Sequence, residues 1–357
     1  MNEREGMARA LDLAWRGWGR VQPNPLVGAV VLRDGEVVGE GWHPEFGDRH
    51  AETVALAGAG ERARGATIVV TLEPCAHQGK QPPCTEAIIQ SGIRRVVAAI
   101  PDPNPMAGHG SEQLRAAGVD VELGPLSEAA AAQNAIFLHS FRSPARPYVA
   151  LKLATTLNGR IADGFGRSRW ISGPQGREYV QWLRAGFDAI AVGGRTARLD
   201  DPSLTVRGPV QPRTPPRRVI FDSAADLGPQ LTLVRTAREI PTVVVVSPTA
   251  ELTRVKRLEA AGVAVVRSGT LPDALQCLRQ LGVGSLLVEG GGQLAGALLT
   301  AGLVDRYHWL QAPVWLGDDA VPALSGLTAR PLDQAERWRV VERRALGEDT
   351  LLVIDRN

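Results

Sequence analysis

The stretch from His50 to Cys84 determines how the first half of this chain folds and what chemistry it supports. It begins His50-Ala51-Glu52 and ends Pro74-Cys75-Ala76-His77-Gln78-Gly79-Lys80-Gln81-Pro82-Pro83-Cys84. One imidazole and two thiolates are suitable ligands for a catalytic zinc ion, which keeps its fourth position open for water. A carboxylate two residues after the histidine can take a proton from that water and return it to a leaving amine. His50, Cys75 and Cys84 are therefore the predicted zinc ligands, and Glu52 is the predicted catalytic residue.

The order of these residues matches the H-x-E and P-C-x-x-C signature of zinc nucleobase deaminases, although the two cysteines are separated by eight residues instead of two. The alternative is two buried structural cysteines and a surface histidine, because a free cysteine is often only a small core residue. However, Pro82 and Pro83 stand beside a polar loop that contains glycine, which is not typical of a core segment. Ligand type and spacing agree, so zinc-dependent deamination is the favoured interpretation.

Length and composition indicate a globular protein of two domains. The chain has 357 residues, 44% of them hydrophobic and 22% charged, and this length exceeds one ordinary core. The net charge of +2 gives little support for a nucleic-acid partner, which would favour a basic stripe. The charged N-terminus predicts no secretory signal, and residues 286–304 contain Glu289 and several glycines, so no membrane span is expected. An odd number of cysteines favours a reducing compartment, and we expect a cytoplasmic protein.

Residues 1–144 alternate between predicted helices and strands. Helices are expected at about residues 5–18, 50–57, 84–90, 111–117 and 126–142, and strands at 26–32, 36–40, 66–72, 95–100 and 119–123. This alternation predicts a layered α/β domain with metal ligands at strand ends and helix starts. A helix that begins at His50 would place the positive end of its dipole near Glu52. Residues 143–147, with a proline on both sides, are the predicted domain boundary.

Residues 147–357 indicate a second α/β domain with a mostly parallel sheet. The expected strands, at 148–153, 189–192, 219–221, 242–246, 264–266 and 285–288, are apolar on both faces. Ligands of such sheets bind at the carboxyl ends of the strands, where this sequence places polar clusters. Glycines 290–292 alone are more often a tight turn than a cofactor site. Together with Thr196, Asp200 and Ser223 at neighbouring strand ends, they favour a dinucleotide site with phosphate at the helix start.

Short motifs over nearly the whole chain match one known family. In the first half they are Pro23-Asn24-Pro25, His50-Ala51-Glu52, Thr71-Leu72-Glu73-Pro74-Cys75, Pro82-Pro83-Cys84 and Asp102-Pro103-Asn104-Pro105; in the second they include Lys152-Leu153, Trp170-Ile171, Asp200-Asp201-Pro202 and Val288-Glu289-Gly290-Gly291. By these motifs the chain resembles the bifunctional deaminase–reductases of riboflavin biosynthesis, which share its long cysteine spacing. The resemblance implies a cytidine-deaminase-like α/β/α domain followed by a dihydrofolate-reductase-like α/β domain. It implies zinc-dependent deamination of 2,5-diamino-6-(5-phosphoribosylamino)pyrimidin-4-one, followed by NADPH-dependent reduction of the ribosyl group to ribityl.

The resemblance also implies roles for individual residues. In the deaminase domain, Asn24, His77 and Lys80 match substrate contacts. The positions that match the NADPH site are Ala154, Trp170, Thr196, Asp200, Ser223, Gly291, Gly292, Gln293, Leu294, Ala295, Gly296 and Ala297. The positions that match the reductase substrate site are Lys152, Ser168, Arg184, Leu204, Arg207 and Glu289. Arg184 and Arg207 suit a phosphorylated substrate because a guanidinium grips phosphate with two donors, although each is otherwise an ordinary solvated charge.

Three positions depart from the family pattern. Arg49 replaces a proline before the metal-binding histidine, Gln81 replaces a threonine, and Asn158 stands where most members have aspartate. Asparagine carries no charge, so a residue at position 158 cannot act as a carboxylate in this chain. Asparagine holds a turn as well as aspartate does.

Two other functions stay open on the sequence. A deaminase that edits a base in tRNA or DNA would share the zinc motif but would need a basic groove. A zinc-stabilised binding protein without activity would have no use for Glu52. We expect small phosphoribosylaminopyrimidine substrates, no nucleic-acid or membrane partner, and a homo-oligomer.

Overall fold

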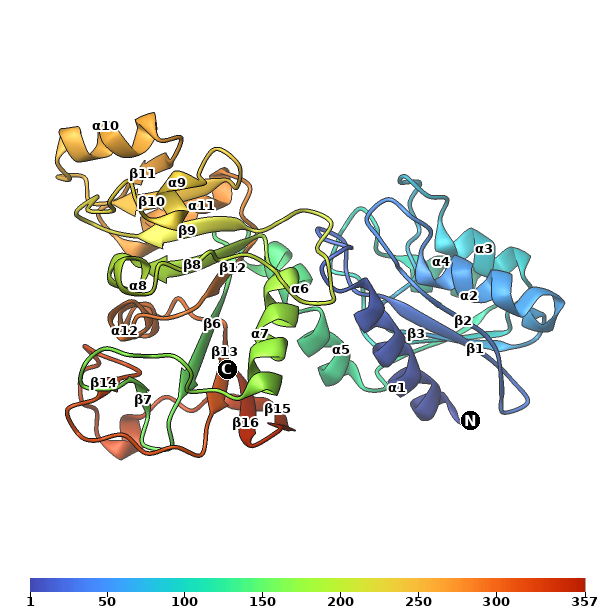
Figure 1. The fold of residues 1–357 in the computed structure, drawn as a ribbon. Helices are drawn as coiled ribbons and strands as arrows, with labels where there is room; N and C mark the ends of the chain where they lie inside the picture. Colours follow the sequence, from blue (N-terminus) through green and yellow to red (C-terminus); the bar gives the residue numbers. More distant parts are fainter. Residues whose placement is uncertain (357) are drawn as a thin grey trace. The chain divides into compact units, whose positions relative to one another are not determined.

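The structure, a computed structural model, describes residues 1–356 and separates into two compact units (Figure 1). The first unit is Met1–Arg142, and the second begins at Ser143. No helix within the described residues combines the length and the apolar character that crossing a membrane requires.

The first unit is built on a five-stranded sheet with the strand order β2-β1-β3-β4-β5. Its strands are β1 (Gly28–Arg33), β2 (Glu36–Trp42), β3 (Thr67–Val70), β4 (Arg95–Ala98) and β5 (Asp120–Leu123). β1 is antiparallel to β2 and β3, whereas β3, β4 and β5 are parallel. The helices are α1 (Glu3–Ala14), α2 (Ala51–Ala59), α3 (Cys84–Gln90), α4 (Gly110–Ala116), α5 (Ser127–Gln133) and α6 (Ala135–Arg142).

Glycines on the first two strands show that helices cover both faces of this sheet. A side chain at Gly28 would meet the backbone of α1, and a side chain at Gly41 would meet that of α2. Gly41 pairs directly with Ala29, the neighbour of Gly28, and successive residues of a strand face opposite sides. α1 and α2 therefore lie on opposite faces (Figure 1), which is the expected three-layer α/β/α arrangement.

Two predicted helices of the first unit were too long. The helix expected at 5–18 ends at Ala14 and continues as a single 3₁₀ turn, Trp15–Gly17. The helix expected at 126–142 is two helices separated by Asn134. The buried side chain of Asn134 accepts a hydrogen bond from the Leu26 amide (2.8 Å) and donates one to the Leu26 carbonyl (2.9 Å). The break thus occurs where a buried amide ties the C-terminal helices to the chain before β1.

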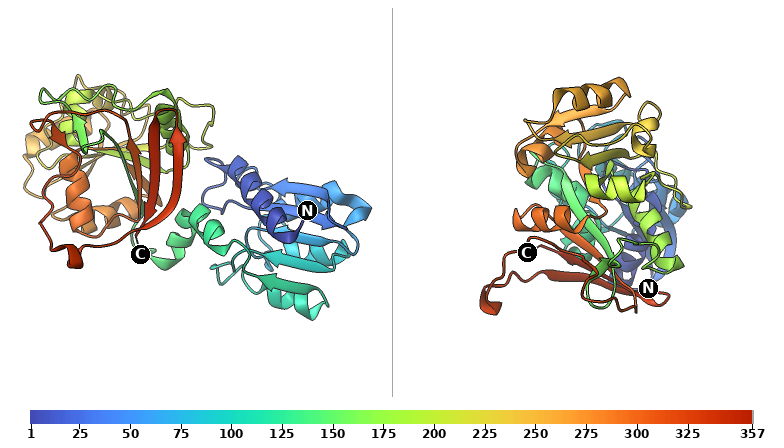
Figure 2. Two further views of the ribbon diagram at one scale, coloured as in Figure 1. Left: turned by 90° about the horizontal axis from the view of Figure 1, so that it is seen from below. Right: turned by 60° about the vertical axis from the view of Figure 1, so that its left-hand side comes forward.

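The second unit has a nine-stranded sheet with the order β11-β10-β9-β8-β12-β6-β13-β16-β15. These strands are β6 (Tyr148–Thr155), β8 (Ala189–Gly193), β9 (Arg217–Phe221), β10 (Thr242–Val246), β11 (Ala264–Arg267), β12 (Ser285–Val288), β13 (Arg306–Gln311), β15 (Arg339–Leu346) and β16 (Asp349–Asp355). Pairing is parallel from β11 to β13 and antiparallel at β16 and β15, the red strands in the left view of Figure 2. β7 (Arg160–Ala162) and β14 (Val321–Pro322) form a separate pair.

Both faces of this sheet are buried under helices. The helices of the second unit are α7 (Pro174–Ala185), α8 (Gly194–Asp200), α9 (Thr232–Arg235), α10 (Leu252–Ala260), α11 (Leu271–Gln280) and α12 (Gly292–Thr300). Along β8, Ala189 and Ala191 belong to a core shared with α11 and α12, whereas Ile190 and Val192 belong to a core shared with α9 and α10. The mostly parallel, doubly covered sheet was therefore predicted correctly from the apolar strands.

Five strands, β7, β13, β14, β15 and β16, were not predicted from the sequence. β15 reads Arg-Val-Val-Glu-Arg-Arg-Ala-Leu and is a mostly exposed edge strand, so it lacks an apolar run. Charged residues are common on edge strands because they discourage pairing with another chain.

Candidate active sites

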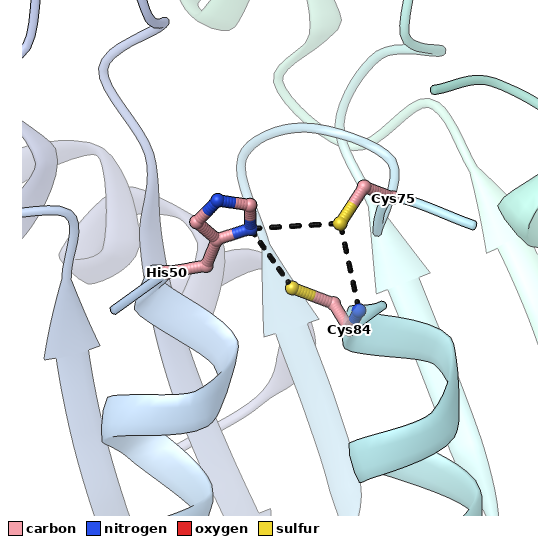
Figure 3. A group of neighbouring side chains, drawn as sticks. All are labelled: His50, Cys75 and Cys84. Atoms are coloured by element: carbon pink, nitrogen blue, oxygen red, sulfur yellow. Dashed lines mark hydrogen bonds between the residues drawn. The ribbon is translucent and has the colours of Figure 1, made fainter. Parts of the chain in front are cut away.

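Three side chains from different elements meet at one point in the first unit (Figure 3). His50 is the N-cap of α2, Cys75 lies in the loop after β3, and Cys84 is the first residue of α3. Their ligand atoms all lie within 4.8 Å of one another. Nδ1 of His50 is 3.2 Å from Cys84 Sγ and 3.5 Å from Cys75 Sγ. Ordinary Zn–N and Zn–S bonds around a tetrahedral zinc ion would separate such atoms by about 3.6 Å, so the residues fit zinc bound through Nδ1.

The pKa values of the Cys75 and Cys84 thiols are shifted in opposite directions. The hydrogen bond from the Cys84 thiol, together with His50, lowers the pKa of Cys75 to about 4, and the same hydrogen bond holds the pKa of Cys84 above its ordinary value. The Cys84 amide also points at Cys75 Sγ, 3.5 Å away. Zinc binds thiolates, so binding of a metal ion would release the thiol protons.

Glu52 lies in the first turn of α2 and is only 4% exposed. Burial raises the pKa of this carboxyl to about 7, against the opposing effect of His50. A carboxyl that titrates near neutrality can both accept and release a proton at working pH. The predicted role of Glu52 thus has a physical basis in its surroundings.

A cavity of about 240 Å³ opens beside the metal ligands. His50, Cys75 and Glu52 line it, and so do all three predicted substrate contacts, Asn24, His77 and Lys80. The structure therefore brings every predicted deaminase residue to this cavity except Cys84, which is fully buried behind it.

The cavity also contains residues that sequence reasoning did not assign. His43 contacts the Asn24 amide with Nε2 at 3.1 Å and the Arg49 carbonyl with Nδ1 at 3.1 Å. Asp102 is another lining residue, and burial raises its pKa to about 6. Arg49 takes part through its backbone carbonyl, which a proline at this position would also provide. The available signal was that His43 precedes His50 in the same polar loop.

Several of the predicted reductase residues lie near the carboxyl ends of β6, β8, β9 and β12, which are neighbours in the sheet. Ala154 is near the end of β6, Thr196 is on α8 after β8, and Ser223 follows β9. A side chain at Gly291 would lie 3.2 Å from Thr196 Oγ1, so the glycine turn after β12 adjoins α8. The Ser168 side chain bonds the carboxylate of Asp200, and Arg169 donates to the Asp200 carbonyl at 2.7 Å.

A buried group of charges joins three of the predicted substrate residues. Arg184 donates to both carboxylate oxygens of Glu289, at 2.6 and 2.8 Å, and to the Thr205 carbonyl at 2.8 Å. Although burial alone would raise it, the pKa of Glu289 is lowered by Arg184. Burial lowers the pKa of Lys152, which Glu289 opposes. Because Glu289 already occupies two donors of Arg184, this guanidinium is less free to grip phosphate than the sequence suggested.

Leu204 and Trp170, two other predicted positions, differ in how exposed their side chains are to a ligand. The side chain of Leu204 is buried in the core beneath α9 and α10, so a ligand could reach only its backbone. Trp170 is 69% exposed, with the Arg177 guanidinium 4.9 Å from its ring.

Close packing is a second reason for glycine at two positions of the predicted cofactor turn. Side chains at Gly292 and Gly296 would collide with the backbone carbonyls of Pro322 and Ser325. Gln293, Leu294 and Ala297 lie on the same helix, and the Ala295 amide already bonds the Gly291 carbonyl. Amides free to bind phosphate therefore belong only to the first turn of α12.

Comparison with known proteins identifies both halves of the chain. Residues 1–100 match the cytidine and deoxycytidylate deaminase zinc-binding region, and residues 147–352 match the RibD C-terminal domain. The chain is 40% identical to riboflavin biosynthesis protein RibD of Escherichia coli strain K12, with 99% of each chain covered.

The chain belongs to the RibD family. It is 36% identical to the solved RibD of Acinetobacter baumannii (form 1), with a TM-score of 0.83 and 99% of each chain covered. A structure from Thermotoga maritima, 34% identical with a TM-score of 0.84 over 99% of each chain, is named as a diaminohydroxyphosphoribosylaminopyrimidine deaminase/5-amino-6-(5-phosphoribosylamino)uracil reductase.

Membership of the RibD family confirms the expected fold classes and the expected type of protein. The chain is a bifunctional enzyme of riboflavin biosynthesis, with a cytidine-deaminase-like zinc domain followed by an NADPH-dependent reductase domain. A base-editing deaminase or an inactive zinc protein would not account for the reductase half.

Proposed function

We propose that the first domain deaminates 2,5-diamino-6-(5-phosphoribosylamino)pyrimidin-4-one and that the second reduces the ribosyl group of the product. The name of the Thermotoga maritima relative supports this substrate pair. The observation that carries the proposal is the joint lining of one cavity by the metal ligands His50 and Cys75, the buried carboxyl of Glu52, and the polar residues Asn24, His77 and Lys80. This set combines what hydrolysis of a ring amine needs with groups able to hold a phosphorylated base.

In the deaminase domain, each residue has a distinct task. A bound zinc ion would supply a water of lowered pKa beside Glu52. Glu52 takes a proton from that water and passes it to the ring amine, so one water is consumed and one ammonia leaves. Asn24, fixed by His43, and His77 orient the pyrimidine. Among the described residues that line the cavity, Lys80 is the only lysine or arginine, so it faces the phosphate.

In the reductase domain, the carboxyl ends of the parallel strands divide between cofactor and substrate. Thr196, Asp200, Ser223 and the first turn of α12 hold NADPH, since helix-start amides suit its phosphates. The buried group of Lys152, Arg184 and Glu289 forms the substrate end, where hydride reaches C1′ of the ribose in its opened imine form. Arg207 is exposed and contacts the substrate phosphate, a task for which Arg184 has fewer free donors.

We assign deamination to residues 1–144 and reduction to residues 147–357. The substrates are small molecules, and three free cysteines suit a reducing, cytoplasmic setting. A homo-oligomer stays a prediction.

A coupled assay tests the order of the two steps. Purified protein should release one ammonia per phosphoribosylaminopyrimidine and then oxidise one NADPH. The deaminated substrate alone should support NADPH oxidation, and protein stripped of metal should keep that second activity. NADPH oxidation without ammonia release would refute the proposed order, and absence of ammonia would refute the deaminase substrate.

A further inference from the structure

We infer that Phe46 is a positioning residue for the deaminase substrate, because its ring holds Lys80 in place for the substrate phosphate without neutralising its charge. This inference rests on the proposed function and adds a residue that the zinc chemistry does not use. It starts from the charges around the cavity. Four acidic residues line it, Asp48, Glu52, Glu73 and Asp102, against Lys80 as the one lysine or arginine among the described lining residues. An available cation at Lys80 would offset these acids for a phosphorylated substrate.

The geometry gives Lys80 a neutral partner. Its Nζ lies 4.0 Å from the centroid of the Phe46 ring, which is within the range of a cation–π contact. Phe46 belongs to the loop between β2 and α2, and Lys80 belongs to the loop between the two metal-binding cysteines. Both side chains line the cavity. The contact therefore fixes the ammonium between two loops that both line the cavity.

Neighbouring contacts hold the same two loops together. The side-chain amide of Gln81 donates through Nε2 to the Gly47 carbonyl at 3.0 Å. Gln81 and Gly47 are each the next residue after Lys80 and Phe46. A side chain at Gly47 would come within 3.8 Å of Lys80 Nζ, so the ammonium also lies against this glycine. Gln81, one of the departures from the family pattern, thus has a structural task in this chain.

An aromatic ring suits this task better than a carboxylate would. A carboxylate would pair with the ammonium and compete with the phosphate, whereas a ring attracts the cation weakly and leaves its charge available. Glu45 is the acid next to Phe46 in sequence, and it is paired with Arg20. Lys80 has no ion pair within the described part of the chain. Restricting this long, exposed side chain beforehand lowers the entropy lost when phosphate binds.

Kinetics with two variants and two substrates test the inference. Phe46→Leu keeps apolar volume but removes the ring, and Phe46→Tyr keeps the ring as the matched control. Phe46→Leu should raise the deaminase KM about two- to fivefold with little change in kcat, and Phe46→Tyr should stay near the original protein. With the dephosphorylated substrate the effect of Phe46→Leu should disappear. An unchanged KM, or an equal rise for both substrates, would overturn the inference.

Nuclear magnetic resonance supplies a readout that needs no activity. The sequence contains only three lysines, Lys80, Lys152 and Lys256, so lysine side chains labelled with ¹³C at Cε give a small set of signals. The Lys80 signal, assigned by its loss in Lys80→Arg, should be shifted upfield by the ring and should move back in Phe46→Leu. A Lys80 signal at the position of exposed Lys256 would contradict the contact. If the original protein releases no ammonia, the proposed function fails, whereas normal ammonia release with an unaffected Phe46→Leu variant defeats this inference alone.

Discussion

The metal centre of the first unit and the strand-end site of the second unit are built in different ways. The metal ligands lie within residues 50–84, and their donor atoms lie within 4.8 Å of one another. The predicted reductase residues are spread from Lys152 to Ala297 and depend on the order of four neighbouring strands to come together. A metal site is defined by a few donors in fixed geometry, whereas a cofactor site at a sheet edge is defined by topology. The metal site can therefore be predicted from a sequence motif, whereas the cofactor site can be located only when the fold is known.

The two sites also treat their central carboxylates differently. Glu52 is buried with a pKa raised to about 7, whereas the pKa of Glu289 is held below its ordinary value by Arg184. One carboxyl is thus ready to exchange a proton at neutral pH, and the other is held ionised in a buried ion pair.

The largest expected effect comes from Glu52→Gln, which keeps the shape of the side chain but removes its basicity. Deaminase turnover should fall by about 10²- to 10⁴-fold, the usual contribution of a positioned acid–base group. Zinc content, measured by mass spectrometry, and the reductase rate should not change. Glu61→Gln, an exposed acid on the turn after α2, is the control. Near-normal ammonia release from Glu52→Gln would remove the assigned role.

Arg184→Met should strongly destabilise the second unit, because it leaves the Glu289 carboxylate buried without its partner. Breaking such a pair costs about 3–5 kcal/mol. Thermal unfolding should show the loss, with deaminase activity retained. The double variant Arg184→Met/Glu289→Gln should recover part of it, since no carboxylate is then left unpaired, although Lys152 loses the charge of Glu289. If the double variant were as unstable as the sum of both single changes, the pair would not be the cause.

Arg207→Ala should raise the KM of the reductase substrate about tenfold to a hundredfold, as expected for losing a charged hydrogen bond to phosphate. The deaminase reaction should be unaffected. Arg235→Ala, an exposed arginine on α9, provides the control. A KM equal to that of the control would show that the substrate phosphate binds elsewhere.

The smallest effect is expected from Asn158→Asp, which restores the residue most common in the family. Asn158 Nδ2 donates to the Leu316 carbonyl at 2.6 Å, and its Oδ1 accepts from Thr156 Oγ1 at 2.7 Å. A carboxylate cannot donate, so the variant should lose about 1–3 kcal/mol of local stability. Hydrogen exchange of residues 312–316 should become faster. Unchanged exchange would mean that the amide donor has no role in holding this segment.

Much of the first unit could be predicted because its signals are local. The ligand types and their spacing lie within short stretches, and the structure brings the three ligands together. His43 was missed because its importance arises only from its contact with Asn24 across the fold. The break at Asn134 was missed for the same reason, since its partner Leu26 is distant in sequence.

In the second unit, the apolar parallel strands were predictable but the details of the site were not. Gly292 and Gly296 match cofactor positions of the family, and in the structure they also make room for the segment that contains Pro322 and Ser325. Leu204 matches a substrate position of the family, but its side chain is buried in the core. Such packing reasons depend on which segments lie side by side, and no local pattern contains that information.

X-ray absorption at the zinc edge of the purified protein tests the central claim most directly. We predict one zinc ion per chain with one nitrogen neighbour at about 2.0 Å, two sulfur neighbours at about 2.3 Å and one oxygen neighbour. Cys75→Ser and Cys84→Ser should each remove one sulfur from this shell, whereas Cys277→Ser should leave it unchanged. Absence of bound zinc, or a shell without both sulfurs, would contradict the account.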